Sequence, residues 1–237
     1  MRVTGSSGCA SQKILSIRLR QGGLSFYAPA GEGCEERSEE VRFLPQEERS
    51  ARLAAAFETF AAAYGTYDSL RIFVDTADTV FVPEAVVDSC SPETWLARMG
   101  VALSQRQTVV VTKAYDGVCA LFPLEAEIVS RFEEMPGMRA EWYSPMQESM
   151  AAFRRSTVSG ACFVVYPTQE NVYVSRYDAA EELALAEVYP LRGEADMVYY
   201  LSELAEDDRT ATICLYGDRP VKYRPVLKRY FGRVTVI

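Results

Sequence analysis

The alternation of apolar and polar residues near the start of the chain predicts a β-hairpin. Between residues 13 and 20 the apolar side chains Leu15, Ile17 and Leu19 occupy every second position, and residues 24–27 form a second short run after two glycines. A period of two is typical of a strand with one covered face. We therefore expect this hairpin to belong to a sheet that is buried on one side.

Hydrophobic periodicity and capping residues divide the rest of the chain into helices and strands. Helices are predicted at residues 45–64, 91–100, 124–134, 144–155 and 192–208, with a helical turn after Pro83 and a short helix before the last strand. Strands are predicted at residues 69–76, 79–83, 107–123 (a hairpin turning at Asp116 and Gly117), 139–143, 160–190 (three strands), 210–217 and 233–237. The polar residues 29–40 are predicted to form an exposed loop.

The two halves of the chain share one order of elements. Each begins with a hairpin or meander and continues with a helix, a buried strand, and a further helix and strand, although no repeat of the residues themselves is visible. The pattern predicts an α/β fold of two related subdomains, residues 1–157 and residues 158–237. Each subdomain is expected to hold a mixed sheet flanked by helices.

Composition excludes several classes of function. With 237 residues, 49% hydrophobic and 24% charged, the chain has the composition of a globular protein. Because it contains no histidine, no Ser/His/Asp or Cys/His catalytic relay can form within it. Its net charge of -8 disfavours binding to the phosphates of nucleic acids.

Cysteine spacing and hydropathy predict a cytoplasmic protein. The six cysteines include no CxxC pair, and Cys119, Cys162 and Cys214 fall within apolar strand patterns, so reduced, buried thiols are expected. The N-terminus lacks the apolar run of a secretory signal, and no segment has the length and hydropathy of a membrane-spanning helix.

Four segments resemble an uncharacterised family of Bacteroidetes proteins with an actin-like ATPase (ribonuclease-H-like) fold and no established function. They are LSIRLRQGGLSF at residues 15–26, TVFVPEAVVD at residues 79–88, DMVYYLSEL at residues 196–204 and ICLYGD at residues 213–218. None of them is a catalytic signature. The resemblance implies two actin-like subdomains, a cytoplasmic location and a nucleotide-sized cleft between the subdomains.

The first turn of each half is the candidate phosphate site. In the ATPases of this fold, backbone N–H groups and hydroxyls of both turns contact phosphate, while a strand aspartate in each half holds magnesium through water. The candidates here are Gly22, Gly23 and Ser25 in the first half and Thr168 and Asn171 in the second.

The chain departs from that ATPase pattern at each place where it would be needed. No acidic residue occurs between residues 14 and 30, Pro167 lacks an N–H group, and only Gly217 stands where a glycine pair would meet the adenosine. Gly22 and Gly23 are most simply explained as turn formers. No cofactor is predicted, and ATP with Mg²⁺ is kept as the alternative.

Two further features invite a functional interpretation. Asp75, Asp78 and Asp88 could hold a metal ion, but acids beyond strand ends more often form turns and caps, so no metal site is predicted. Adjacent helical positions point about 100° apart, so if Tyr200 packs inward, Tyr199 lies nearer the surface. Tyr199 is therefore a candidate for contact with a partner, with core packing as the other interpretation.

The hypothesis that follows is a non-catalytic actin-like protein that acts through protein–protein interaction, with no catalytic residues. The alternative is nucleotide binding or weak ATPase activity in the cleft between the subdomains, with a non-standard phosphate site. Binding of another small ligand in the same cleft is a third alternative.

Overall fold

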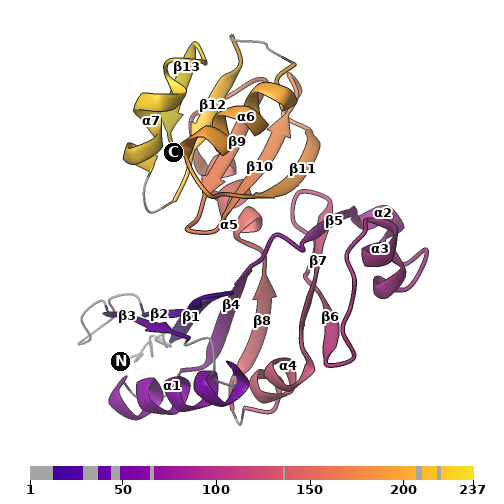
Figure 1. Cartoon of the computed structure of the whole chain (residues 1–237), viewed down its shortest axis with the longest axis vertical. Helices are drawn as coiled ribbons and strands as arrows, with labels where there is room; N and C mark the ends of the chain where they lie inside the picture. Colours follow the sequence, from indigo (N-terminus) through magenta and orange to yellow (C-terminus); the bar gives the residue numbers. More distant parts are fainter. Residues whose placement is uncertain are drawn as a thin grey trace, which may run out of the picture.

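The computed structural model describes residues 13–28, 37–43, 49–64, 67–135, 137–206, 210–217 and 220–237. Two five-stranded mixed sheets dominate them, and a three-stranded antiparallel sheet lies beside the first (Figure 1). The second sheet lies at the top of Figure 1 and the first at the bottom, with helix α5 between them.

The first sheet has the strand order β3-β2-β1-β4-β8. Its strands are β1 (Ile14–Arg20), β2 (Gly23–Ala28), β3 (Arg37–Arg42), β4 (Ser69–Asp75) and β8 (Arg139–Tyr143). Strands β1, β2 and β3 form an antiparallel meander, and β4 and β8 run parallel to β1. Helices α1 (Arg49–Tyr64) and α4 (Ala126–Glu133) contribute to a single core with this sheet, in which the rings of Phe57 and Phe132 meet edge to face at 6.1 Å.

The second sheet repeats this arrangement with the order β11-β10-β9-β12-β13. Its strands are β9 (Cys162–Pro167), β10 (Asn171–Tyr177), β11 (Leu183–Pro190), β12 (Thr212–Leu215) and β13 (Arg233–Val236). Helices α6 (Glu194–Leu204) and α7 (Pro220–Leu227) cover one face. Helix α5 (Pro145–Arg155), which follows the last strand of the first sheet, covers the other face through Met146, Met150 and Phe153.

An insertion between β4 and α4 forms the small sheet, with the order β5-β7-β6. It contains β5 (Val80–Pro83), α2 (Glu84–Val87), α3 (Pro92–Arg98), β6 (Gln107–Val111) and β7 (Val118–Glu125). Asp116 and Gly117 have positive φ angles of 51° and 76° between β6 and β7, as the sequence predicts for the turn of this hairpin. Leu96 of α3 packs with Val80 and Leu121 into a core of the insertion's own.

One prediction about the first half was wrong. Residues 37–40, expected to lie in an exposed loop, belong to strand β3, which pairs with β2 from Gly23↔Arg42 to Ala28↔Arg37. The backbone of β2 gains hydrogen bonds along its otherwise open edge, and the charged side chains of β3 suit an edge strand. The rest of the predicted loop, residues 29–36, lies outside the described residues, as do residues 45–48 of the predicted first helix.

The remaining predicted helices and strands are confirmed, with shifts of a few residues at their ends. Residues 207–208 of the helix predicted at residues 192–208 lie outside the described residues. Cys119, Cys162 and Cys214 are free and buried, as expected for small apolar side chains within strands. Among the described residues, no helix has the length and hydropathy needed to cross a membrane.

Candidate functional site between the two sheets

The two sheets meet through the turns that follow their first strands. The turn after β1 belongs to the first half, and the turn after β9 belongs to the second. Glu170 of the second turn reaches the first turn, and Asn171 reaches Asp75 at the end of β4. The positions that the sequence singles out as candidate phosphate turns therefore lie in contact with each other.

The first turn uses its free N–H groups to bind a carboxylate of the same chain. The N–H groups of Gln21 and Gly22 donate to Oε2 and Oε1 of Glu170, at 3.3 Å each. Two adjacent N–H groups facing two oxygens form the kind of concave anion site that also accepts phosphate. In this structure the anion that they hold is a side chain.

Gly23 and Ser25 have other roles. A Cβ atom added to Gly23 would lie 2.4 Å from the backbone oxygen of Val41, so the close approach of β3 requires glycine at this position. Ser25 lies on β2 opposite Arg18 of β1 and lines a large cavity between the sheets. These two candidates do not converge with Gly22 on one ligand position.

The polar groups of the second turn are engaged within the protein. The N–H of Thr168 donates to the backbone oxygen of Asn171 at 2.8 Å, and Oγ1 of Thr168 accepts from the N–H of Asn171 at 3.0 Å. The side-chain amide of Asn171 donates to Oδ1 of Asp75 at 2.8 Å. Thr168 and Asn171 thus fix the turn and join it to the first sheet.

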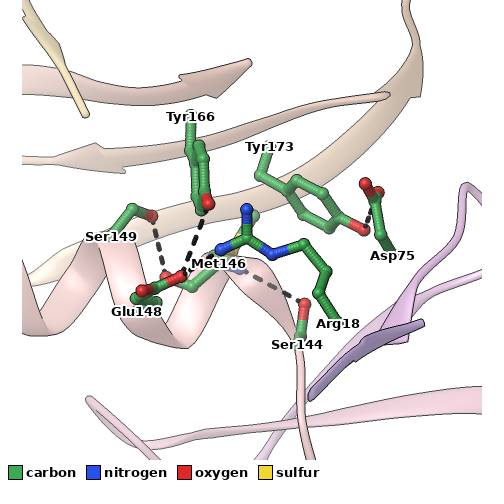
Figure 2. Close-up of polar contacts among 8 residues, drawn as sticks. All are labelled: Arg18, Asp75, Ser144, Met146, Glu148, Ser149, Tyr166 and Tyr173. Carbon is green, nitrogen blue, oxygen red and sulfur yellow. Dashed lines mark hydrogen bonds and ion pairs between the residues drawn. The ribbon is translucent and has the colours of Figure 1, made fainter. Parts of the chain in front are cut away.

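Asp75 is the buried centre of this contact. Its side chain is 2% exposed, and Oδ1 also accepts from the hydroxyl of Tyr173 at 3.0 Å (Figure 2). Burial raises the pKa of Asp75 above its ordinary value of 3.8, against the opposing effect of hydrogen bonds from Asn171, Thr168 and Tyr173. The pKa of Tyr173 is also raised, chiefly by burial and secondly by the charge of the neighbouring Asp75.

The metal hypothesis gains no support from the three aspartates. The N–H of Asp78 donates to Oγ1 of Thr76 at 3.2 Å, and Asp88 is the C-cap residue of α2. Within the described part of the chain, no group of three or more acidic or cysteine residues is placed to hold a metal ion. Asp78 and Asp88 therefore have turn and cap roles, which is the interpretation that the sequence favours.

A second polar contact joins β1 to helix α5. Figure 2 shows Arg18 extending from β1 to Glu148, with Nη2 and Oε2 separated by 3.0 Å. The hydroxyl of Tyr166 donates to the same carboxylate at 3.4 Å, and the guanidinium of Arg18 lies 5.5 Å from the centre of that ring. One carboxylate on α5 therefore binds a group from each of the two large sheets.

The sequence of α5 explains why this helix is held firmly in place. Ser144 and Gln147 form a capping box, in which the side chain of Gln147 accepts from the N–H of Ser144 at 2.9 Å. The amide of Gln147 also donates to Oγ1 of Thr112 and the backbone oxygen of Lys113, at 3.1 and 2.8 Å. The helix is thereby tied to the insertion as well as to both large sheets.

Two cavities flank these contacts. A cavity of about 330 Å³ lies beside the paired turns and is lined by Asp75, Asp78, Glu125 and Glu170, with Arg20 as its basic residue. A larger cavity of about 930 Å³ lies between the first sheet, α5 and Tyr216. Its basic residues are Arg18, Arg71, Lys113 and Arg155, and Glu148 is its acidic residue. The smaller cavity is predominantly acidic and the larger one predominantly basic.

Tyr199, the candidate for contact with a partner, lies on the surface of α6 and is 62% exposed. Its ring meets that of Tyr200 at 5.6 Å, and Tyr200 stacks on Tyr189 at 4.4 Å. Tyr200 is thus the half-buried member of the pair, and Tyr199 is not packed in the core.

Comparison with known proteins identifies the fold. A Bacteroides thetaiotaomicron protein of unknown function with an actin-like ATPase fold superposes with a TM-score of 0.77, at 16% identity over 96% of this chain and 91% of that one. The chain has the actin-like ATPase fold. A chain of the PilM-PilN type IV pilus biogenesis complex superposes with a TM-score of 0.62, at 10% identity over 95% of this chain and 88% of its own length. The AlfA filament structure from a B. subtilis plasmid superposes with a TM-score of 0.50, at 9% identity over 94% of this chain and 91% of that one.

These similarities confirm the fold that the sequence predicts, and the Bacteroides protein agrees with the resemblance of the four segments. No family profile and no curated protein matches the chain. At identities of 9 to 16%, the actin-like fold carries over to this chain, while the activities of these proteins do not.

Sequence reasoning missed the two carboxylates that organise the site. Glu170 lies within a turn whose polar residues were considered only as phosphate ligands, and Glu148 lies in a predicted helix with no distinguishing neighbour. The sequence does contain one indication of the role of Glu170. This residue is acidic and lies in a turn that would face phosphate, and a negative charge there disfavours the binding of an anion.

Proposed function

We propose that this actin-like chain works by binding another protein and does not hydrolyse nucleotide. The observation that carries the proposal is the carboxylate of Glu170 on the N–H groups of Gln21 and Gly22. A phosphate arriving at that turn must displace a side chain that already satisfies both donors. The protein-binding half of the proposal is supported by the PilM-PilN complex, in which a chain of this fold was solved together with another protein.

Electrostatics around the paired turns favours the same proposal. The smaller cavity carries Asp75, Asp78, Glu125 and Glu170 against Arg20. Two unit charges of like sign about 5 Å apart repel by about 3 kcal/mol at an effective dielectric constant of about 20. A triphosphate entering there meets several such repulsions, and the described residues offer no cluster of metal ligands to offset them.

Titration calorimetry with ATP, in the presence and absence of Mg²⁺, tests the nucleotide half of this proposal. Wild-type protein is expected to give no binding heat at micromolar concentrations and no release of phosphate. Glu170→Gln is the matched variant because it keeps the shape of the side chain and removes its charge. Micromolar, magnesium-dependent binding to the wild type would overturn the proposal.

The protein-binding part of the proposal is tested by cross-linking in the native cell, followed by co-purification of the chain with its partner at fixed stoichiometry. We expect a defined partner that can be reconstituted with the purified chain. If no purified protein recovered in this way binds the chain, the proposal fails.

A second candidate function, binding of a nucleotide or another small anion, rests on the larger cavity. Its volume of about 930 Å³ and its four basic residues suit a phosphorylated ligand. This binding would not depend on Glu170 and would be lost when Arg71 and Arg155 are replaced. The same calorimetric series therefore separates it from binding at the turns.

A further inference from the structure

One face of the first sheet carries polar and aromatic side chains in two rows that cross its strands. Strand register places Ser38, Tyr27, Ser16, Arg71 and Glu141 side by side in the first row. The second row consists of Glu40, Ser25, Arg18, Phe73 and Tyr143. Eight of these side chains line the larger cavity: Ser38, Tyr27, Ser16, Arg71, Ser25, Arg18, Phe73 and Tyr143.

The equivalent face of the second sheet is covered by a helix. In each half, the helices between the third and fourth strands and between the fourth and fifth strands share a core with their sheet. On the opposite face of the second sheet, Met146, Met150 and Phe153 of α5 pack against Val164 and other strand residues. On the opposite face of the first sheet, the described chain places only the edge of α5, residues 113–115 and Tyr216 around the cavity.

We propose that this open face is the docking groove for an acidic, amphipathic helix of a partner protein. The inference rests on the proposed protein-binding function and names the surface and the chemistry of the partner. The groove is defined by the side chains of these rows that line the cavity, together with Lys113, Tyr115, Glu148, Arg155 and Tyr216. The partner's helix would cover this face of the first sheet, as α5 covers the equivalent face of the second sheet.

The size of the cavity suits a short stretch of helix. A helix about 10 to 12 Å across that rises about 1.5 Å per residue fills roughly 120 to 170 Å³ per residue. The cavity of about 930 Å³ therefore accepts about six to eight residues, or two turns. Because two turns are not stable alone in water, the segment would be part of a longer helix or would fold on binding.

The charge of the groove specifies an acidic partner. Four basic side chains and one carboxylate line it, whereas the whole chain has 25 basic and 33 acidic residues. Arg18 and Lys113 already form ion pairs with Glu148 and Glu141, at 3.0 and 2.9 Å. Arg71 and Arg155 lie exposed at the groove and are the cations best placed to meet acidic residues.

Aromatic rings supply the apolar part of the groove. Phe73 and Tyr143 stack at 5.3 Å, and Tyr27, which is 43% exposed, lies two strands away. Tyr115 and Tyr216 contribute further rings from the insertion and from the second half. Tyrosine and phenylalanine with flanking arginine are enriched where proteins bind one another, and such rings accept the apolar stripe of an amphipathic helix.

A displayed library of helices of about 18 residues tests the inference. The library fixes leucine on one stripe and allows Glu, Lys, Ser or Ala elsewhere, and it is selected on the full chain. We expect enrichment of helices with glutamate on both sides of the stripe. Their affinity should fall by about tenfold or more on the double variant Arg71→Glu with Arg155→Glu, a change of at least about 1.4 kcal/mol.

The matched control is Arg106→Glu with Arg192→Glu, which changes the net charge equally at two exposed positions outside the cavity lining. This control should bind the selected helices as the wild type does, and circular dichroism of both variants checks that they fold. The inference is overturned if no helix is enriched, if basic helices are enriched, or if both double variants lose binding equally.

Two further outcomes separate this inference from the proposed function. If ATP without magnesium, or inorganic phosphate, binds at micromolar concentration and displaces the selected helix, the groove belongs to a small anion and the inference fails. If the native partner binds equally well to Arg71→Glu with Arg155→Glu, for example through Tyr199, the inference fails while the protein-binding function stands. Magnesium-dependent binding of ATP at the Glu170 turn would overturn the proposed function instead.

Discussion

The two large sheets have the same strand order but are covered differently. Strand β9, at the centre of the second sheet, is buried at every position from Cys162 to Pro167. Strand β1, at the centre of the first sheet, alternates, with Leu15 and Ile17 inaccessible and the intervening Ser16 and Arg18 partly exposed. A duplicated fold has thus produced one sheet with two buried faces and another with one.

The difference shows that the pattern of apolar residues in a strand depends on how many faces of its sheet are covered, as well as on the secondary structure. A strand between two packed layers is apolar throughout, whereas a strand with one wet face alternates. The run CFVVYP of β9 and the alternating run ILSIRLR of β1 are examples of these two cases. The polar face of the first sheet is therefore encoded in the sequence, and any partner that covers it must suit arginine, serine and tyrosine.

The largest expected effect comes from removing the cover of the second sheet. Phe153 of α5 is 2% exposed and stacks on Tyr177 at 4.4 Å, so Phe153→Ala should cost about 3 to 5 kcal/mol of unfolding free energy. Phe73→Ala, on the open face of the first sheet, should cost less than half as much because its ring is only partly buried.

Urea unfolding monitored by circular dichroism and by tryptophan fluorescence measures both variants. Trp95 and Trp142, the two tryptophans of the chain, lie in the first half, so fluorescence reports on that half alone. Equal losses for Phe153→Ala and Phe73→Ala would contradict the difference in coverage.

The next largest effect concerns Asp75, where the two sheets meet. Asp75→Ala removes the acceptor of the buried amide of Asn171 and of the hydroxyl of Tyr173. Each buried donor left unpaired costs about 1 to 3 kcal/mol. Removal of the buried charge offsets part of that cost, so the net loss should be about 2 to 4 kcal/mol. Asp75→Asn keeps an acceptor oxygen and removes the buried charge, and it serves as the matched variant.

The pH dependence of stability distinguishes these variants. Because the pKa of Asp75 is raised on folding, the folded protein binds the proton more tightly than the unfolded chain does. The free energy of unfolding that Asp75 contributes therefore falls as pH rises from its ordinary value of 3.8 through the folded value. Asp75→Asn should be more stable than the wild type at pH 7, and the difference should shrink as the pH is lowered. A difference that stays constant with pH would contradict the raised pKa.

Much of the fold, and less of the site, could be predicted from the sequence. The hairpins, helices and their order depend on local periodicity, caps and turn residues, which a single sequence contains. Strand β3 was missed because its sequence RSEEVR has the composition of a loop, and only pairing with β2 makes it a strand.

The contacts of the site could not be predicted because they join residues far apart in the chain. Glu170 and Gln21 are separated by 149 positions, and Asp75 and Asn171 by 96. The sequence draws attention to both turns, but no local pattern indicates that one turn supplies the anion for the other. The sequence favours a turn or cap role for Asp75 and gives no sign of its burial, because that burial depends on the second half of the chain.

The smallest expected effect tests the edge of the first sheet, whose meander forms the open face. Gly23→Ala should cost about 1 to 3 kcal/mol, because its Cβ would lie 2.4 Å from the backbone oxygen of Val41 and the β2–β3 pairing would have to shift. Gly22→Ala should cost about 0.5 kcal/mol or less, because its Cβ would meet only the carboxylate of Glu170, at 3.2 Å, and that side chain can move.

Thermal unfolding of both variants, together with amide hydrogen exchange in β2 and β3, measures the difference between the two glycines. Faster exchange confined to β2 and β3 in Gly23→Ala would show that this glycine serves strand pairing, because only backbone atoms of β3 oppose a side chain there. If Gly22→Ala proves to be the more damaging change, the contact between Glu170 and the first turn stabilises the protein more than the meander does. The glycine pair would then matter chiefly for the junction of the two sheets.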